Sequence, residues 1–343
     1  MATGYATAAE QVDADDLAYG EQPVRQLQDR PAAGDHDQKA IRQIRTEMTG
    51  VRLSFTWCGT RKTLSADQRH QAATSFQAER EAITASKKLL DTSHEAFRRV
   101  TAVRSRATAL WRSWTLPFPE PGIRLIRQDR VEAFQTSMAE HRDELLEAAG
   151  RLAGVYDELK SQARARLGEL FAEEDYPRSL AGAFDMSWDY PSLEPPAYLL
   201  ALSPEIYRQE QRRVAEQFDQ AVGLAEQAFA SELGRLVSHL AERLAGSPGE
   251  PPRIFKNSAI GNLREFITRF EEPNIRSSSD LENLVRQARA TIDGVVPDDL
   301  RTSATLRASV SQDVERIAAA VTTFMAERPR RSILRRSRVE DSV

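Results

Sequence analysis

Two interleaved series of seam residues with a seven-residue spacing run through residues 131–159. The first series is Val131, Met138, Leu145, Leu152 and Leu159, and the second is Phe134, His141, Ala148 and Val155. Because an α-helix makes one turn every 3.6 residues, positions seven apart lie on nearly the same face. The pattern predicts a long helix, ending near residue 172, whose apolar seam must be covered by another part of the protein.

A second long helix is predicted over residues 65–114. Ser65 with Gln68 has the spacing of a capping box, in which each side chain satisfies a backbone donor of the first turn. Prolines at 117, 119 and 121 end the pattern, because proline lacks a backbone donor and clashes with the preceding turn. A polar stretch at residues 91–93 is the one place where this helix can bend or break.

Residues 203–245 predict a third long helix. Ser203 is a favourable N-cap and Pro204 occupies the first turn, where its missing donor costs nothing. The apolar stripe from Val214 to Leu244 repeats every eleven residues, a spacing that keeps it on one face of a straight helix. Together the three segments predict a mainly α protein, a long antiparallel three-helix bundle that resembles a coiled coil.

Alternating apolar and polar residues predict short strands at 51–57 and 184–190. Two antiparallel helices of similar length return the chain to its starting point, so these strands are expected to share a small β-sheet that caps one end of the bundle. Residues 60–64 are predicted to pair with 51–57 across a turn at Cys58 and Gly59. The strand at 123–126 is expected alone at the far end, and this geometry fails if the first helix breaks at Asp91.

The domain organisation follows from shifts in composition. Residues 1–40 contain eight acidic and three basic side chains and no sustained apolar period, which is typical of disordered segments. The predicted parts are a disordered acidic leader (1–47), the bundle with its β cap (48–245), a linker (246–255), C-terminal helical segments (256–327) and a basic tail (328–343).

Most kinds of catalytic site have no support in the sequence. Cys58 is the single cysteine, so neither an intrachain disulfide nor a thiolate metal cluster can form from one chain. The five histidines are never at close ligand spacing, and neither a phosphate-binding P-loop nor a G-x-S-x-G motif is found. No apolar run approaches the roughly 20 residues needed to cross a bilayer, and the first residues do not have the basic region followed by an apolar region that is typical of a secretion signal. These features predict a cytoplasmic protein that is not an enzyme, has no cofactor and does not associate with membranes.

One group of acidic residues was weighed as a metal site. Its members are Glu173, Glu174, Asp175, Asp185 and Asp189. Alternation places Asp185 and Asp189 on one strand face, where oxygen ligands can converge on Mg²⁺ or Ca²⁺. The alternative is a solvated strand face whose charge is offset by Arg178. The second interpretation is favoured, and no metal is expected.

Aromatic residues near the proline cluster are a candidate partner-binding surface. They are Trp111, Trp114 and Phe118, with Arg112 beside them. Tryptophan and arginine dominate the binding energy of many protein interfaces. The alternative is an apolar plug that closes the end of the helix.

The basic tail is a candidate nucleic-acid-binding segment. Its arginines are Arg328, Arg330, Arg331, Arg335, Arg336 and Arg338, with no acidic residue among them. Arginines that neutralise phosphates release counterions and so favour nonspecific binding. The alternatives are a solvated charged tail or pairing with the acidic leader.

Several motifs together resemble the uncharacterised bacterial and phage family DUF3150 over about residues 48–245. They are Lys87-Lys88-Leu89-Leu90-Asp91, the turn from Trp114 to Gly122, Asp175-Tyr176-Pro177 and Phe184-Asp185-Met186-Ser187-Trp188. The resemblance implies no activity and no catalytic residues. It implies an association with phage or mobile elements and a partner such as a MoxR-type AAA+ ATPase or a von Willebrand A-type protein.

These observations favour a structural or adaptor protein that binds partner proteins through its helical stalk. The heptad seam can be covered within one chain or between two, so a homo-oligomer is an alternative to a monomer. The second hypothesis is a nonspecific nucleic-acid-associated protein that uses the arginine tail.

Overall fold

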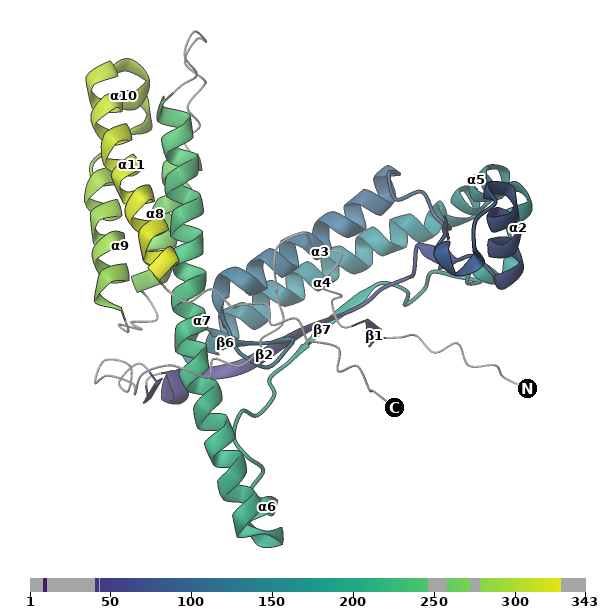
Figure 1. Cartoon of the computed structure of the whole chain (residues 1–343), viewed down its shortest axis with the longest axis horizontal. Helices are drawn as coiled ribbons and strands as arrows, with labels where there is room; N and C mark the ends of the chain where they lie inside the picture. Colours follow the sequence, from purple (N-terminus) through teal and green to yellow (C-terminus); the bar gives the residue numbers. More distant parts are fainter. Residues whose placement is uncertain (1–8, 11–40, 43, 246–257, 272–277, 328–343) are drawn as a thin grey trace, which may run out of the picture. The chain divides into compact units, whose positions relative to one another are not determined.

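The computed structural model shows a mostly helical chain with a small antiparallel sheet (Figure 1). The residues that it describes are 9–10, 41–42, 44–245, 258–271 and 278–327. The chain divides into two compact units, residues 1–25 with 48–207 and residues 26–47 with 208–343. Across the described ranges, no helix combines the length and the apolar character needed to cross a membrane.

Strand β2 (Met48–Thr56) organises the sheet of the first unit. It pairs antiparallel with β6 (Ile123–Arg127) and with β7 (Asp185–Asp189), and Arg52 of β2 is in register with a residue of each. β5 (Thr115–Pro117) extends the sheet beyond β6, and the short β1 (Ala9–Glu10) pairs with the end of β2. The predicted pairing of 184–190 with 51–57 is therefore confirmed.

The strand at 123–126 does not lie alone at a far end, as predicted. It is β6, hydrogen-bonded between β2 and β5 inside the sheet. The reason is that the helix before it is much shorter than expected, so the β5–β6 hairpin forms where the sheet already is.

The predicted helix over 65–114 is broken. α2 (Ala66–Phe76) starts with the expected capping box at Ser65 and ends where Gln77 takes up a left-handed conformation, with φ of 52°. A strand, β4 (Ser86–Lys88), follows, and the next helix is α3 (Glu95–Trp114).

The break before α3 has a local cause. The carboxylate of Asp91 accepts hydrogen bonds from the backbone N–H of Ser93 at 2.9 Å and from its hydroxyl at 2.6 Å. His94 then caps α3 by accepting from the N–H of Ala96. Such short-range side-chain bonds compete with helix formation.

Residues 60–64 were expected to pair with 51–57, but β3 (Arg61–Thr63) pairs instead with β4, a strand that forms because the predicted helix is broken there.

The heptad seam is the buried face of α4 (Val131–Gly154) and α5 (Tyr156–Leu167), which are separated at Val155. Its buried members are Phe134, Met138, Leu145, Ala148, Leu152 and Leu159. α3 runs antiparallel beside α4 (Figure 1), and Arg106 of α3 pairs with Glu144 of α4 at 2.6 Å.

The sheet packs against this helix pair rather than capping its end. The apolar face of β2, with Val51, Leu53 and Phe55, belongs to the same core as the seam of α4 and the buried side chains of α3. In Figure 1, β2 and β7 run beneath the two helices. The predicted three-helix bundle is not confirmed: within the first unit, α3 and one face of the sheet share a core with the seam.

The third predicted helix is α7 (Pro204–Ala245), and the hydroxyl of Ser203 accepts from the N–H of Ile206 as expected of an N-cap. Its predicted stripe is buried at Val214, Phe218, Val222, Ala225, Leu233, Leu236, Leu240 and Leu244. The part from Ala230 onward shares a core with the C-terminal helices. These are α8 (Ser258–Glu271), α9 (Ser279–Ile292), α10 (Pro297–Thr302) and α11 (Ala304–Glu327).

The sequence places the end of the main domain after residue 245, whereas the packing groups residues 208–245 with the C-terminal helices. One reason is the close approach of two helices at Gly234 of α7. A Cβ atom there would lie 3.2 Å from Cγ1 of Val321 in α11.

Within the predicted leader, the described residues 9–10, 41–42 and 44–47 have regular structure, and Ile44 is buried.

Candidate functional site

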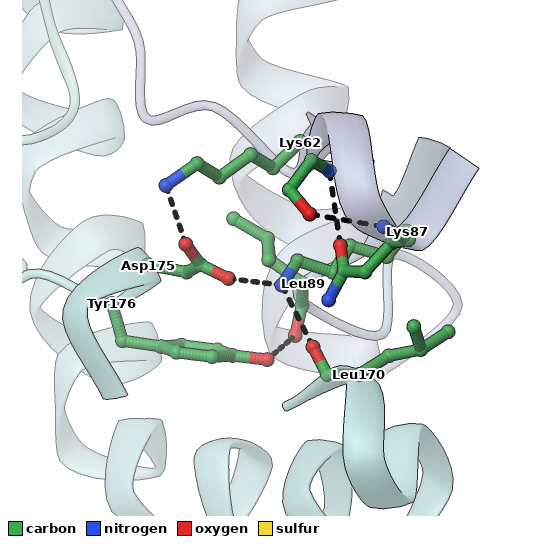
Figure 2. Close-up of polar contacts among 8 residues, drawn as sticks. Lys62, Lys87, Leu89, Leu170, Asp175 and Tyr176 are labelled. Carbon is green, nitrogen blue, oxygen red and sulfur yellow. Dashed lines mark hydrogen bonds and ion pairs between the residues drawn. The ribbon is translucent and has the colours of Figure 1, made fainter. Parts of the chain in front are cut away.

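Lys87 and Asp175 form a buried ion pair at the edge of the first unit (Figure 2). The Nζ of Lys87 lies 2.5 Å from Oδ2 of Asp175, and the two side chains are 5% and 3% exposed. Lys87 comes from β4, and Asp175 ends the 3₁₀ turn Glu173–Asp175. Lys87 also donates to the carbonyl oxygen of Leu170 at 2.7 Å.

A second lysine approaches the same carboxylate from the solvent side. The Nζ of Lys62, from β3, lies 2.5 Å from Oδ1 of Asp175, and this side chain is 53% exposed. Figure 2 shows Lys62 and Lys87 on either side of the carboxylate. One aspartate thus holds both strands of the β3–β4 ribbon, which is defined as Arg61–Thr63 and Ser86–Lys88.

Tyr176 forms a third contact between the segment that contains Asp175 and the β3–β4 ribbon. Its hydroxyl donates to the carbonyl oxygen of Leu89 at 2.9 Å, and its ring stacks on Phe171 with centroids 5.0 Å apart. The N–H of Leu89 in turn donates to Thr60 at 2.8 Å. We call the contacts of Lys62, Lys87, Asp175 and Tyr176 the lysine–aspartate clamp.

The electrostatics of the clamp favour a charged aspartate. Burial acts to raise the pKa of Asp175, but hydrogen bonds from Lys62 and Lys87, together with their charges, outweigh it and lower the pKa. Burial raises the pKa of the Tyr176 hydroxyl, which stays a neutral donor. Because both carboxylate oxygens already receive an ammonium group, the arrangement is suited to holding two chain segments together rather than to binding a metal or transferring a proton.

The other acidic candidates are also paired with cations. Asp185 accepts two bonds from the guanidinium of Arg142, at 2.8 and 2.9 Å, and Asp189 accepts two from Arg52, at 3.1 and 2.7 Å. These hydrogen bonds lower the pKa of each aspartate.

The two glutamates of the acidic group do not complete a site. Glu173 bonds to Lys160 and to Arg164, the latter at 2.7 Å, and Glu174 is exposed. In the described part of the chain, no group of three or more His, Cys, Asp or Glu side chains is placed to hold a metal ion. The charge compensation expected from Arg178 comes from other residues, namely Arg52, Lys62, Lys87, Arg142, Lys160 and Arg164.

The predicted aromatic surface is largely internal. Trp111 and Phe118 are buried, and Trp114 is half-buried with its ring centroid 6.2 Å from that of Phe134. The guanidinium of Arg124 lies 5.5 Å from the ring centre of Trp111, and Arg112 is half-buried. This burial matches the interpretation as an apolar plug. The predicted tail arginines, from Arg328 to Arg338, lie outside the described residues.

Sequence reasoning missed an exposed apolar surface around α6 (Tyr198–Leu202). Tyr198, Leu200, Leu202 and Ile206 are between 51% and 75% exposed. The signal was present as the run Tyr198-Leu199-Leu200-Ala201-Leu202, which stands between the proline-rich loop and the N-cap of α7. We call these four exposed side chains the α6 surface.

No family model matches this chain, and neither a curated protein nor a solved structure is found to be similar to it. The resemblance to DUF3150 therefore stays a prediction. Two of the motifs that carry it, residues 87–91 and 175–177, meet in the lysine–aspartate clamp.

Proposed function

We propose that this chain is a non-enzymatic adaptor that binds a partner protein through the α6 surface. The observation that supports this proposal most strongly is the exposure of four large apolar side chains within nine residues. Single exposed apolar residues are common, whereas apolar side chains gathered on an exposed surface are a feature of protein interaction sites. Burying it in a partner recovers about 25 cal/mol for each Å² of apolar area removed from water.

The backbone around the α6 surface is already ordered for binding. The N–H of Ser203 donates to the carbonyl oxygen of Leu199 at 2.8 Å, and the N–H of Tyr207 donates to the carbonyl oxygen of Ser203 at 3.0 Å. These two bonds connect α6 to the start of α7. Pro204 fixes the backbone at the junction. A segment that is ordered before binding loses less conformational entropy on association.

The spacing of the exposed side chains favours one mode of recognition. Tyr198 and Leu202 lie four residues apart in α6, the spacing by which helical segments anchor in an apolar groove, and Ile206 follows in the first turn of α7 beyond the extended Ser203. The partner is therefore a protein with such a groove. The family resemblance favours a MoxR-type AAA+ ATPase or a von Willebrand A-type protein as this partner. It also favours a phage or mobile element as the source of the adaptor, which acts in the cytoplasm.

The paired acids support the non-enzymatic part of the proposal. Asp175, Asp185 and Asp189 each engage lysine or arginine through both carboxylate oxygens. A general base or metal ligand needs at least one free oxygen directed at its substrate or ion. The lysine–aspartate clamp is, in this proposal, a structural element of the adaptor.

The proposal is tested with a double variant of the α6 surface, Leu202→Asp with Ile206→Asp. In a pull-down from nuclease-treated host lysate, the wild-type chain is expected to retain a protein that the double variant loses. Phe76→Asp is the matched control, because Phe76 is 79% exposed and lies on α2, far from α6 in the sequence. The proposal is contradicted if the control loses the same protein or if the double variant keeps it.

A further inference from the structure

The β3–β4 ribbon is unusual in its composition. Its three register pairs are Arg61 with Lys88, Lys62 with Lys87, and Thr63 with Ser86. Every residue is either cationic or a hydroxyl, and none is apolar or aromatic. Neighbouring residues in a strand point to opposite faces, so the ribbon has two chemically different sides.

The inner side is neutralised in part by the lysine–aspartate clamp. Lys62 and Lys87 both contact Asp175, and Lys87 is buried there. The outer side carries Arg61, Thr63, Ser86 and Lys88, all of which are exposed.

The outer side carries two like charges that no acidic side chain of the described residues pairs with. Arg61 and Lys88 lie directly opposite each other, and neither takes part in an ion pair within the described stretches of the chain. Cross-strand neighbours have Cβ atoms about 5 Å apart, and like charges at such positions destabilise the pairing. A bound anion would remove this repulsion.

We infer that the outer side of the β3–β4 ribbon is a contact surface for the phosphate backbone of duplex DNA. Arginine, lysine, serine and threonine are the residue types that most often bond to phosphate oxygens. The centres of protein–protein interfaces are depleted in charged residues, whereas three of the six ribbon residues are lysines and one is an arginine. The lack of an aromatic side chain also argues against single strands, whose bases stack on aromatic rings.

Duplex DNA is the partner proposed, because neutralising phosphates releases more counterions from a B-form duplex than from a single strand. Proteins contact duplex RNA mostly through phosphates and 2′-hydroxyls across its wide minor groove, so an RNA duplex is the comparison that the test includes.

The ribbon is also held rigidly for such a contact. At one end of the ribbon the backbone N–H of Leu64 donates to the carbonyl oxygen of Ala85 at 3.0 Å. At the other end the N–H of Leu89 donates to the carbonyl oxygen of Thr60 at 2.8 Å. Lys87 and Asp175 fix its inner side. This inference does not depend on the α6 surface, and its residues are separate from the arginine tail.

The experiment measures the affinity of the full-length chain for a short mixed-sequence DNA duplex by fluorescence anisotropy at several salt concentrations. All variants carry glutamine at the six tail arginines, so that the tail does not contribute. We expect Arg61→Ala with Lys88→Ala to weaken binding several-fold at low salt. The slope of log K against log salt concentration should fall in magnitude by roughly 1.8, because each phosphate contact contributes about 0.9.

The charge-matched control is Arg98→Ala with Arg235→Ala, two exposed arginines outside the ribbon. It should leave the salt slope unchanged. Three results would overturn the inference: equal effects of the two double variants, the absence of any DNA binding in the tail-substituted chain at low salt, or an equally tight complex with polyglutamate or an RNA duplex. Circular dichroism of each variant verifies that the fold is retained.

Discussion

The Nζ of Lys87 lies 2.5 Å from Oδ2 of Asp175, with both side chains buried. This pair joins β4 to the segment that follows α5. An ion pair removed from water stabilises a fold only when its remaining donors and acceptors are satisfied. Here Lys62 donates to Oδ1 of the same carboxylate, and Lys87 also donates to the carbonyl oxygen of Leu170.

Removal of the aspartate should therefore be costly. Asp175→Ala leaves the buried ammonium of Lys87 with the carbonyl of Leu170, and we expect a loss of about 3–5 kcal/mol in the free energy of unfolding. Lys62→Ala is the control, because it removes the exposed lysine and leaves the buried pair intact. Its cost should stay below about 1 kcal/mol. Urea denaturation of both variants measures the difference, and equal costs would show that the buried pair has no special role.

The clamp should also make stability depend on acid pH. The folded-state pKa of Asp175 is lowered, so the stabilisation is complete above the unfolded-state pKa of about 3.9 and is lost as the pH falls through the folded-state value. The wild-type chain should therefore lose stability more steeply than Asp175→Asn below about pH 4. Unfolding free energies measured from pH 7 downward test this. Parallel curves for the two proteins would contradict it.

The parts of the fold that the sequence predicts are those with a strong local period. The strands at 51–57 and 184–190 and their pairing are confirmed, as are the capping box at Ser65 and the buried seam of α4. The apolar spacing specifies which face of each strand and of α4 is buried, and the capping box is a local polar motif. The pairing of the two strands was expected from two long helices, the first of which is broken, so that geometry is not the reason for the pairing.

The errors come from places where a short-range interaction overrides that spacing. Asp91 and Ser93 bond to each other and interrupt a region whose apolar positions still fit a helix. Once that helix is short, β6 joins the sheet instead of lying apart from it.

The candidate site could be predicted only in part, for a different reason. Sequence reasoning singled out Asp175 but could not show that Lys62 and Lys87 are its partners, since nothing local indicates a contact across such a long separation in the chain. For Trp111 and Phe118 the sequence left open a partner surface and an apolar plug, because the burial of a helix end depends on what packs over it.

The aromatic cluster of the first unit should be the most sensitive part of its core. Phe184 is buried, and its ring meets the ring of Trp57 edge-on at 4.9 Å and that of Phe97 at 6.2 Å. We expect Phe184→Ala to cost about 3–5 kcal/mol, because it leaves a cavity among rings. Phe76→Ala, at an exposed position, should cost close to nothing. Thermal unfolding of both variants gives the comparison, and similar melting temperatures would count against this view of the core.

Divalent cations should not bind at the acidic residues of the first unit. Arg52 and Arg142 already engage Asp189 and Asp185, and a metal would have to displace them. We therefore expect titration calorimetry with Mg²⁺ or Ca²⁺ to show no saturable heat. Saturable binding that disappears in an Asp185→Ala, Asp189→Ala double variant would refute this and would restore the metal-site hypothesis.

The central claim, that the α6 surface binds a partner protein, is tested most directly by a photo-crosslinking amino acid placed at Leu202 in host cells, with the same amino acid at Phe76 for comparison. The account predicts a discrete adduct with one other protein from position 202 and none from position 76, together with loss of that adduct when Ile206→Asp is added. Adducts only between two copies of this chain, or equal labelling from both positions, would contradict it.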